Sequence, residues 1–243
     1  MKSAMVFKLC KDPKDAVVAS DGTADWGMSS LAASDDDFRA SEIARELGGQ
    51  VIGLTIGTGD LAWAAARGAA ETVVISDVMP SADAATTAAI LAAAIRKIGD
   101  VDLVLIGDSA WDPAVPVLLG AKLGWTILAG ILEVKENESG LTVKRRTLSA
   151  EQEIEIAVPA VLGIIAQSAE ETPPGLKQVL MARKKPVTKL TSADLGVDAA
   201  EAVVCRGYAL PDSTEAVMIN GETSEEVVQN LFDACLLYTS RCV

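Results

Sequence analysis

Residues 101–113 read Val101-Asp-Leu-Val-Leu-Ile106 and then Gly107-Asp-Ser-Ala-Trp-Asp-Pro113. The first half is an almost continuous apolar run. Such a run is typical of a central parallel strand that is covered on both faces. The second half leads from the end of that strand to the start of a helix predicted at residues 115–123.

Outward from this run, strand patterns alternate with helical ones. Further strands are predicted at residues 4–9, 51–56 and 72–75. Apolar residues recur at helical spacing around Ala40–Leu47, within residues 60–70 and around Leu91–Ile98. The alternation predicts an α/β fold, a doubly wound and mostly parallel sheet of the Rossmann-like, adenine-nucleotide-hydrolase-like kind.

The pattern changes after this part of the chain. Segments 129–134, 141–147 and 151–158 alternate in polarity and are separated by turn residues, which predicts an antiparallel ribbon. Residues 160–166 return to a buried strand. The apolar density falls after Leu190, so we expect a body at residues 1–190 and a C-terminal arm at residues 191–234.

Composition excludes several classes of function. The 243 residues carry a net charge of −13, which argues against binding to nucleic-acid phosphates. No histidine is present, so histidine-based catalysis is excluded, and we expect no catalytic constellation and no metal site. The most apolar helix, residues 82–98, is too polar and too short to insert into a membrane.

The last nine residues, Cys235-Leu-Leu-Tyr-Thr-Ser-Arg-Cys-Val243, interrupt the pattern of the helix that begins near Thr223. They back-translate to the transposon mosaic end used in sequencing adaptors followed by its reverse complement. We therefore interpret residues 235–243 as adaptor-derived and expect the helix to break there. Cys10 and Cys205 remain, without a CxxC motif, which favours a reducing, cytoplasmic location.

Three predicted strand ends offer a place for a ligand: Phe7–Cys10, Thr55–Asp60 and Gly107–Pro113. Ligands of open parallel sheets bind outside the carboxyl ends of the strands, and backbone N–H groups there can hold a phosphate. Plain helix capping by Asp108, Ser109 and Asp112 is the alternative. The run Asp35-Asp36-Asp37 precedes a helix, and solvated capping explains it better than metal binding.

A proline-rich turn opens the segment Thr172–Val187. A short helix follows, with Leu176, Val179 and Leu180 on one face, and it ends at Arg183-Lys-Lys-Pro186. Ordinary core packing by that apolar face is one interpretation, and recognition of a partner is the other.

The order of these parts resembles the β subunit of electron-transfer flavoproteins over residues 2–234, nearest its Fix-type branch. The resemblance rests on the Leu-Lys-Gln-Val-Leu helix, the lysine-rich run, Pro186 and the Ala193-Asp-Leu-Gly-Val197 turn. Further matching motifs are Val6-Phe-Lys8, Ala16–Thr23, Glu42–Leu47, Leu54–Gly57, Arg67–Ala70, Asp102–Gly107, Leu119–Trp125 and Val158–Val161.

The resemblance implies a heterodimer whose α subunit holds most of the electron-carrying FAD. The β subunit would hold AMP or a second FAD, and Leu176, with Val179 and Leu180, would dock on a flavin dehydrogenase such as an acyl-CoA dehydrogenase. Nucleotide contacts would fall at Phe7, Lys8, Ser34, Thr55, Ile56, Gly57, Asp108, Ser109, Ala110, Trp111 and Asp112.

The chain departs from this family at the phosphate-gripping loop. The loop after Gly107 is shortened and lacks the threonine and glutamine of the family pattern, and Ser34 stands where Asn-Pro is typical. Two alternatives stay open: a nucleotide-binding sensor of the universal-stress type, and a structural β paralogue that pairs with α but holds no nucleotide.

Overall fold

A computed structural model describes residues 1–12, 15–78, 83–108, 113–138, 140–167, 173–198 and 217–240, with side chains up to Cys235. The chain divides into two compact units, Met1–Arg206 and Gly207–Val243.

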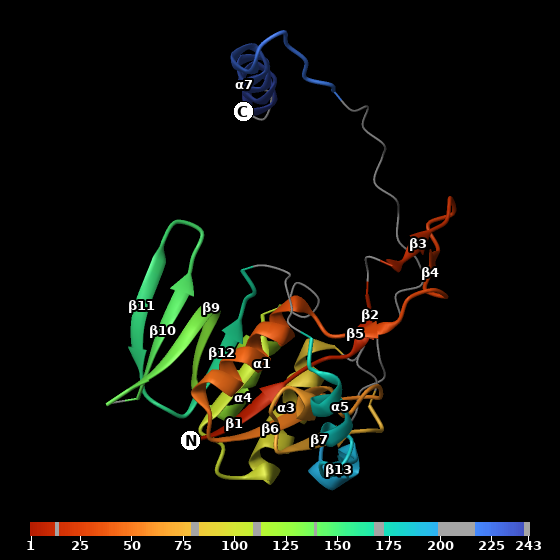
Figure 1. The fold of residues 1–243 in the computed structure, drawn as a ribbon, viewed down its shortest axis with the longest axis vertical. Coiled ribbons are helices and arrows are strands. Elements are labelled where there is room, and N and C mark those ends of the chain that lie inside the picture. The colour runs from red at the N-terminus through yellow and green to blue at the C-terminus, as the bar shows by residue number, and fades with distance from the viewer. Residues whose placement is uncertain are drawn as a thin grey trace. The chain divides into compact units, whose positions relative to one another are not determined.

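The first unit is built on a nine-stranded sheet in the order β11-β10-β9-β12-β8-β1-β6-β7-β13 (Figure 1). Its strands are β1 (Lys2–Val6), β6 (Gln50–Ile56), β7 (Glu71–Ile75), β8 (Leu103–Gly107), β9 (Thr126–Asn137), β10 (Gly140–Arg146), β11 (Glu151–Ile156), β12 (Ala160–Ile164) and β13 (Val187–Leu190). The pairings from β9 through β12, β8, β1, β6 and β7 to β13 are all parallel. Strands β9, β10 and β11 pair antiparallel, as the predicted ribbon requires.

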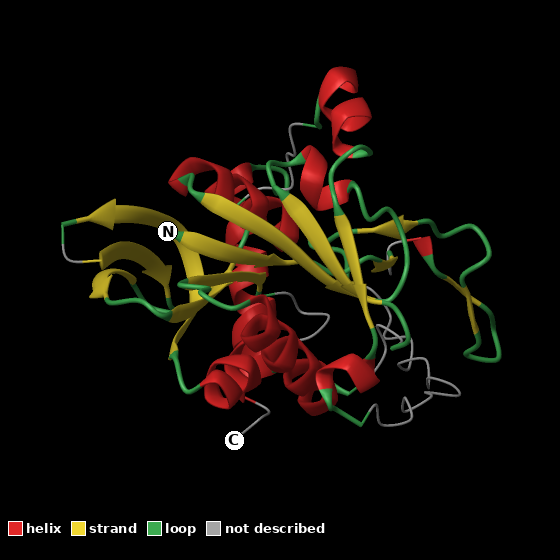
Figure 2. Ribbon diagram, turned by 90° about the horizontal axis from the view of Figure 1, so that it is seen from below, coloured by secondary structure: helices red, strands yellow, loops and turns green. Residues whose placement is uncertain are grey.

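Helices cover both faces of the sheet (Figure 2). The helices of this unit are α1 (Asp35–Leu47), α2 (Trp63–Ala66), α3 (Ala84–Ile98), α4 (Val115–Leu123), α5 (Leu176–Ala182) and α6 (Ser192–Leu195). Alternate residues of β1, together with Phe7 just after it, enter different cores: Ala4 and Val6 lie in the core with α3 and α4, whereas Met5 and Phe7 lie in the core with α1 and α2. The predicted α/β, doubly wound and mostly parallel fold is confirmed.

Two short antiparallel pairs interrupt the connection from β1 to α1. Strand β2 (Cys10–Lys11) pairs with β5 (Leu31–Ala32), and β3 (Val17–Val18) pairs with β4 (Ala24–Asp25). The second pair is the hairpin that the family resemblance places at residues 16–23.

Some local predictions differ from the structure. Helix α2 spans only Trp63–Ala66 instead of residues 60–70, because the chain turns at Gly68, whose φ of 115° a helix does not allow. Strand β13 was not predicted, since Val187-Thr-Lys-Leu190 is a short and mostly exposed edge strand without an apolar run. Helix α6, which follows residue 190, contacts the body of the first unit: the Ser192 backbone N–H donates to Asp77 at 2.9 Å.

The described part of the second unit contains helix α7 (Ser224–Ser240). The helix continues through Cys235, so the expected break at that residue is wrong. The physical reason is that Leu, Leu and Tyr tolerate helical geometry and that neither Gly nor Pro follows before Ser240. Residues 199–216 of the predicted C-terminal arm lie outside the described residues. No helix among the described residues is both long and apolar enough to cross a bilayer.

Candidate functional site

The sheet reverses its winding between β1 and β8. The chain leaves β1 toward β6 and β7 on one side, and then returns through α3 to β8 on the other side of β1. At such a switch point the carboxyl ends of the two central strands border a crevice. Phe7 and Lys8 follow β1 and Asp108 follows β8, so these predicted site residues meet at one edge. Ser109, Ala110, Trp111 and Asp112 lie outside the described residues.

The N-terminus of α1 is held against this edge by Asp37. Ser34 is the N-cap: its Oγ accepts the Asp37 backbone N–H at 3.1 Å. Asp37 Oδ2 accepts the backbone N–H groups of Ser34 and Lys8, each at 3.3 Å. Asp37 is only 5% exposed, and burial raises its pKa to about 6. The expected solvated capping is therefore wrong for Asp37, which caps the helix from inside the protein.

Asp36 and Asp108 complete a group of carboxylates at the same edge. Asp36 Oδ1 accepts the backbone N–H of Ala166, which follows β12, at 2.7 Å. Asp108 Oδ2 accepts the backbone N–H of Gly130 at 3.0 Å. Burial raises the pKa of Asp36, the Ala166 hydrogen bond opposes this shift, and the nearby Asp108 charge adds to it. The group therefore concentrates negative charge at the crevice.

Gly107 leaves the space that this arrangement needs. A Cβ atom at Gly107 would lie 2.7 Å from Asp37 Oδ1 and 3.1 Å from Asp36 Cβ, which is too close for any side chain without movement. Glycine at the last position of β8 therefore leaves room for the side chains of Asp36 and Asp37.

Several backbone N–H groups at this edge are already bonded within the protein. The N–H groups of Lys8, Ser34, Gly130 and Ala166 already bind carboxylates, and that of Gly57 binds the Ile75 carbonyl at 2.8 Å. Thr55 and Ile56 are 2% and 8% exposed, so their side chains belong to the protein interior. The Gly57 N–H is thus used by β7.

An aromatic cluster supports the β1 end of the crevice. Phe7 stacks on Trp63 of α2, with ring centroids 4.9 Å apart and an interplanar angle of 22°. The guanidinium of Arg67 lies 4.3 Å from the Trp63 ring and 4.9 Å from the ring of Phe38. Phe7 is 2% exposed, so it fixes α2 to the sheet instead of presenting a ring to a ligand. Trp63, 7% exposed, is a packing residue that no motif in the sequence singles out.

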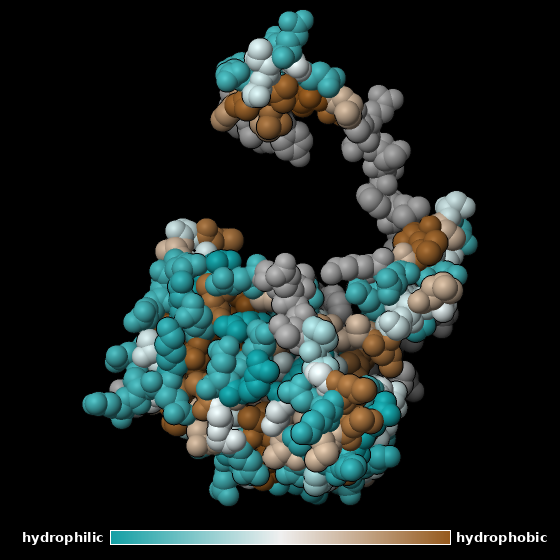
Figure 3. Space-filling model, viewed as in Figure 1, coloured by the Kyte–Doolittle hydropathy of each residue, from teal (hydrophilic) through white to brown (hydrophobic). Residues whose placement is uncertain are grey.

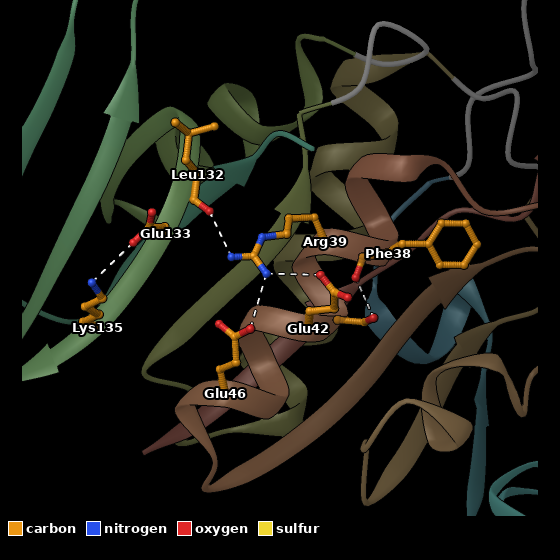
Figure 4. A network of polar contacts seen from close by, with 8 residues as sticks. Phe38, Arg39, Glu42, Glu46, Leu132, Glu133 and Lys135 are labelled. Atoms are coloured by element: carbon orange, nitrogen blue, oxygen red, sulfur yellow. Dashed lines mark hydrogen bonds and ion pairs between the residues drawn. The ribbon is translucent and has the colours of Figure 1, made fainter. Parts of the chain in front are cut away.

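Beside the carboxylate group, a groove of about 550 Å³ runs between α1 and β9. Its lining carries five carboxylates and two cations: Asp35, Glu42, Glu46, Glu133, Glu136, Arg39 and Lys135. Figure 4 shows Arg39 bound to Glu42 at 3.1 Å, to Glu46 at 3.4 Å and to the Leu132 carbonyl at 3.3 Å. Because its arginine is engaged and its charge is negative, the groove does not suit a nucleotide phosphate.

The predicted recognition helix presents apolar side chains outward. Leu176, Leu180 and Met181 of α5 are 76%, 52% and 54% exposed, whereas Val179 is half-buried and Ala182 is 3% exposed. Figure 3 shows hydrophobic surface over α5 and mostly hydrophilic surface over α1. The helix packs through Val179 and Ala182, so the core-packing interpretation is wrong for Leu176 and Leu180. The basic run after α5 ends at Lys185, whose Nζ donates to backbone carbonyls near α2.

Among the described residues, no group of three or more Cys, Asp or Glu side chains is arranged to hold a metal ion. Residues 32–195, which include the carboxylate group, α5 and α6, match a family model described as the electron transfer flavoprotein domain.

Proposed function

Because the chain belongs to the electron transfer flavoprotein family, we propose that it is the β subunit of a Fix-type heterodimer. In this role it relays electrons between a flavin dehydrogenase, such as an acyl-CoA dehydrogenase, and an acceptor. The family match supports electron transfer and a flavin in general. The β assignment rests on the order of motifs in the sequence, from Val6-Phe-Lys8 to the Asp194-Leu-Gly196 turn.

One observation carries the proposal: a seven-residue helix displays Leu176 and Leu180 to solvent on the outer surface of the first unit. Exposed apolar side chains on a helix that is fastened through its other face suit a transient docking surface. Leu176 is the most exposed of these residues and is the proposed anchor, with Leu180 beside it. Val179 belongs to the packed side of α5, so its contribution to docking is indirect.

FAD supplies the one-electron chemistry when it is bound, and we assign most of its binding to the α subunit. Several backbone N–H groups at the carboxyl edge of the sheet are bonded to carboxylates of this chain, which disfavours a phosphate there. We therefore propose that neither AMP nor a second FAD is held tightly here. In this respect the subunit resembles the structural paralogue, which holds no nucleotide of its own. Its proposed docking role is unaffected. The universal-stress-type sensor is less well supported, because a nucleotide sensor requires the phosphate donors that the carboxylates occupy.

Co-expression with the cognate α subunit tests the assignment. We expect a one-to-one yellow complex, because a flavin held mainly by α requires the β body beside it. A colourless, stable monomer that ignores the α subunit would contradict the proposal.

The cofactor content of that complex is a separate prediction. After denaturation, the released nucleotides should amount to one FAD per heterodimer and clearly less than one AMP. The physical reason is repulsion between phosphate and the Asp36, Asp37 and Asp108 group. One AMP or two FAD per heterodimer would show that the edge grips phosphate after all.

A further inference from the structure

Lys185, which follows helix α5, forms hydrogen bonds to residues that are distant in sequence. Its Nζ donates to the carbonyl oxygens of Ala69 at 2.6 Å and Ala65 at 3.2 Å, across 116 and 120 residues of sequence. Ala65 belongs to α2, and Ala69 lies just beyond the helix, after the turn at Gly68. The side chain of Lys185, the last residue of the basic run Arg183–Lys185, is thus directed toward the protein and is half-buried.

Helix α5 depends on such contacts for its position. Seven residues are too few for a stable isolated helix, so its placement comes from packing and from its attachments. After α5, the Pro186 carbonyl accepts the Thr72 N–H at 3.0 Å, and β13 then pairs with β7. Lys185 is the last residue before this pairing begins, and it fixes the C-terminal end of α5 against α2.

Helix α2 is a firm support for this contact. Trp63 stacks on Phe7 in the core, and Gly53 of β6 allows α2 to lie directly on the sheet. A Cβ atom at Gly53 would lie only 2.4 Å from Ala64 Cβ, which shows how closely helix and strand approach. The support under α5 therefore has little room to shift.

We propose that Lys185 is a positioning residue for partner docking: by binding the end of α2 it holds α5 in the orientation that exposes Leu176 and Leu180. The inference rests on the proposed docking function and adds to it a residue that does not itself touch the partner. Lys185 would then influence docking by fixing the position of α5. This differs from electrostatic steering of the partner, which requires an exposed cation.

The test uses the complete heterodimer with Lys185→Met and, as a matched control, Lys189→Met. Lys189 is an exposed residue of β13, so its substitution removes the same charge without removing the α2 contact. The first readout is amide hydrogen exchange at Val179 and Arg183, whose N–H groups bond within the α5 segment. We expect about fivefold faster exchange in Lys185→Met and no change in Lys189→Met.

The second readout is electron transfer from an acyl-CoA dehydrogenase reduced by its acyl-CoA substrate, measured at raised salt to suppress general charge effects. Lys185→Met should raise the apparent KM for the dehydrogenase about fivefold with kcat unchanged, and Lys185→Arg should restore part of the loss. In a Leu176→Ala background the same substitution should change KM less than twofold, because the docking contact it positions is already lost.

The outcomes separate the two proposals. If Leu176→Ala leaves KM unchanged, the docking function fails. If Leu176→Ala raises KM but Lys185→Met behaves like Lys189→Met, only the positioning role fails. Full additivity of Lys185→Met and Leu176→Ala would likewise overturn the positioning role.

Discussion

The carboxyl edge of the sheet and the segment 173–198 differ in which kind of side chain is buried and which is exposed. At the edge, Asp37 is 5% exposed and satisfies backbone N–H groups from inside the protein. In the segment, Leu176 is 76% exposed on a helix that packs through Ala182. A polar group turned inward supports the fold, whereas an apolar group turned outward is available to a partner. Substitutions at the edge should therefore change stability, and substitutions in α5 should change docking.

The largest expected effect concerns Asp37 and the pH dependence of stability. Its pKa is about 6 in the folded protein and 3.8 ordinarily, so the folded state binds the proton more tightly. The stabilisation by the protonated carboxyl is fully present below about pH 4 and is lost as the pH rises through 6. From about pH 3 to pH 7, the free energy of unfolding of Asp37→Asn should gain about 3 kcal/mol relative to the parent.

Urea unfolding of the parent, Asp37→Asn and Asp35→Asn across that pH range measures this difference. Asp35 lies in the same first turn of α1 but is only half-buried, so its substitution controls for the loss of one charge there. Parallel pH profiles for the parent and Asp37→Asn would mean that the carboxyl is not buried as described. At pH 7 the apparent KM for the dehydrogenase should stay unchanged in both variants.

The opposite behaviour is expected of Leu176→Ala. An apolar anchor in a small interface can contribute about 2 kcal/mol, so the apparent KM for the dehydrogenase should rise about thirtyfold. The free energy of unfolding should change by less than about 0.5 kcal/mol, because the side chain is mostly exposed.

Val117→Ala is the matched control for that substitution, since Val117 is 50% exposed on α4, which packs into the other core of the sheet. It should leave KM and flavin content unchanged. If Leu176→Ala lowers the free energy of unfolding but leaves KM unchanged, Leu176 contributes to packing and not to docking.

The central helices and strands could be predicted because their apolar residues follow the regular patterns of a buried strand or a helix. The apolar run at Val101–Ile106 is β8 within two residues, and the helix predicted at residues 115–123 is α4. The spacing from Ser34 to Asp37 is that of a capping box and was readable. The sequence does not show which of three adjacent aspartates turns inward, because that depends on the space left by Gly107. Lys185 and Ala69 are likewise brought together only by the tertiary fold.

The smallest expected effect is a difference in stability between two helix caps, one in each region. Ser34 caps α1 and Thr191 caps α6, and each forms a capping box with an aspartate three residues later. Ser34 is 8% exposed, and its loss would leave the buried Asp37 N–H without an acceptor, so Ser34→Ala should cost about 1.5 kcal/mol. Thr191 bonds Asp194 near the surface of a four-residue helix, where water can replace the lost contact. Thr191→Ala should cost about 0.5 kcal/mol by urea unfolding. Equal costs would mean that the edge is no more enclosed than the segment, and the contrast between the two regions would then rest on Leu176 alone.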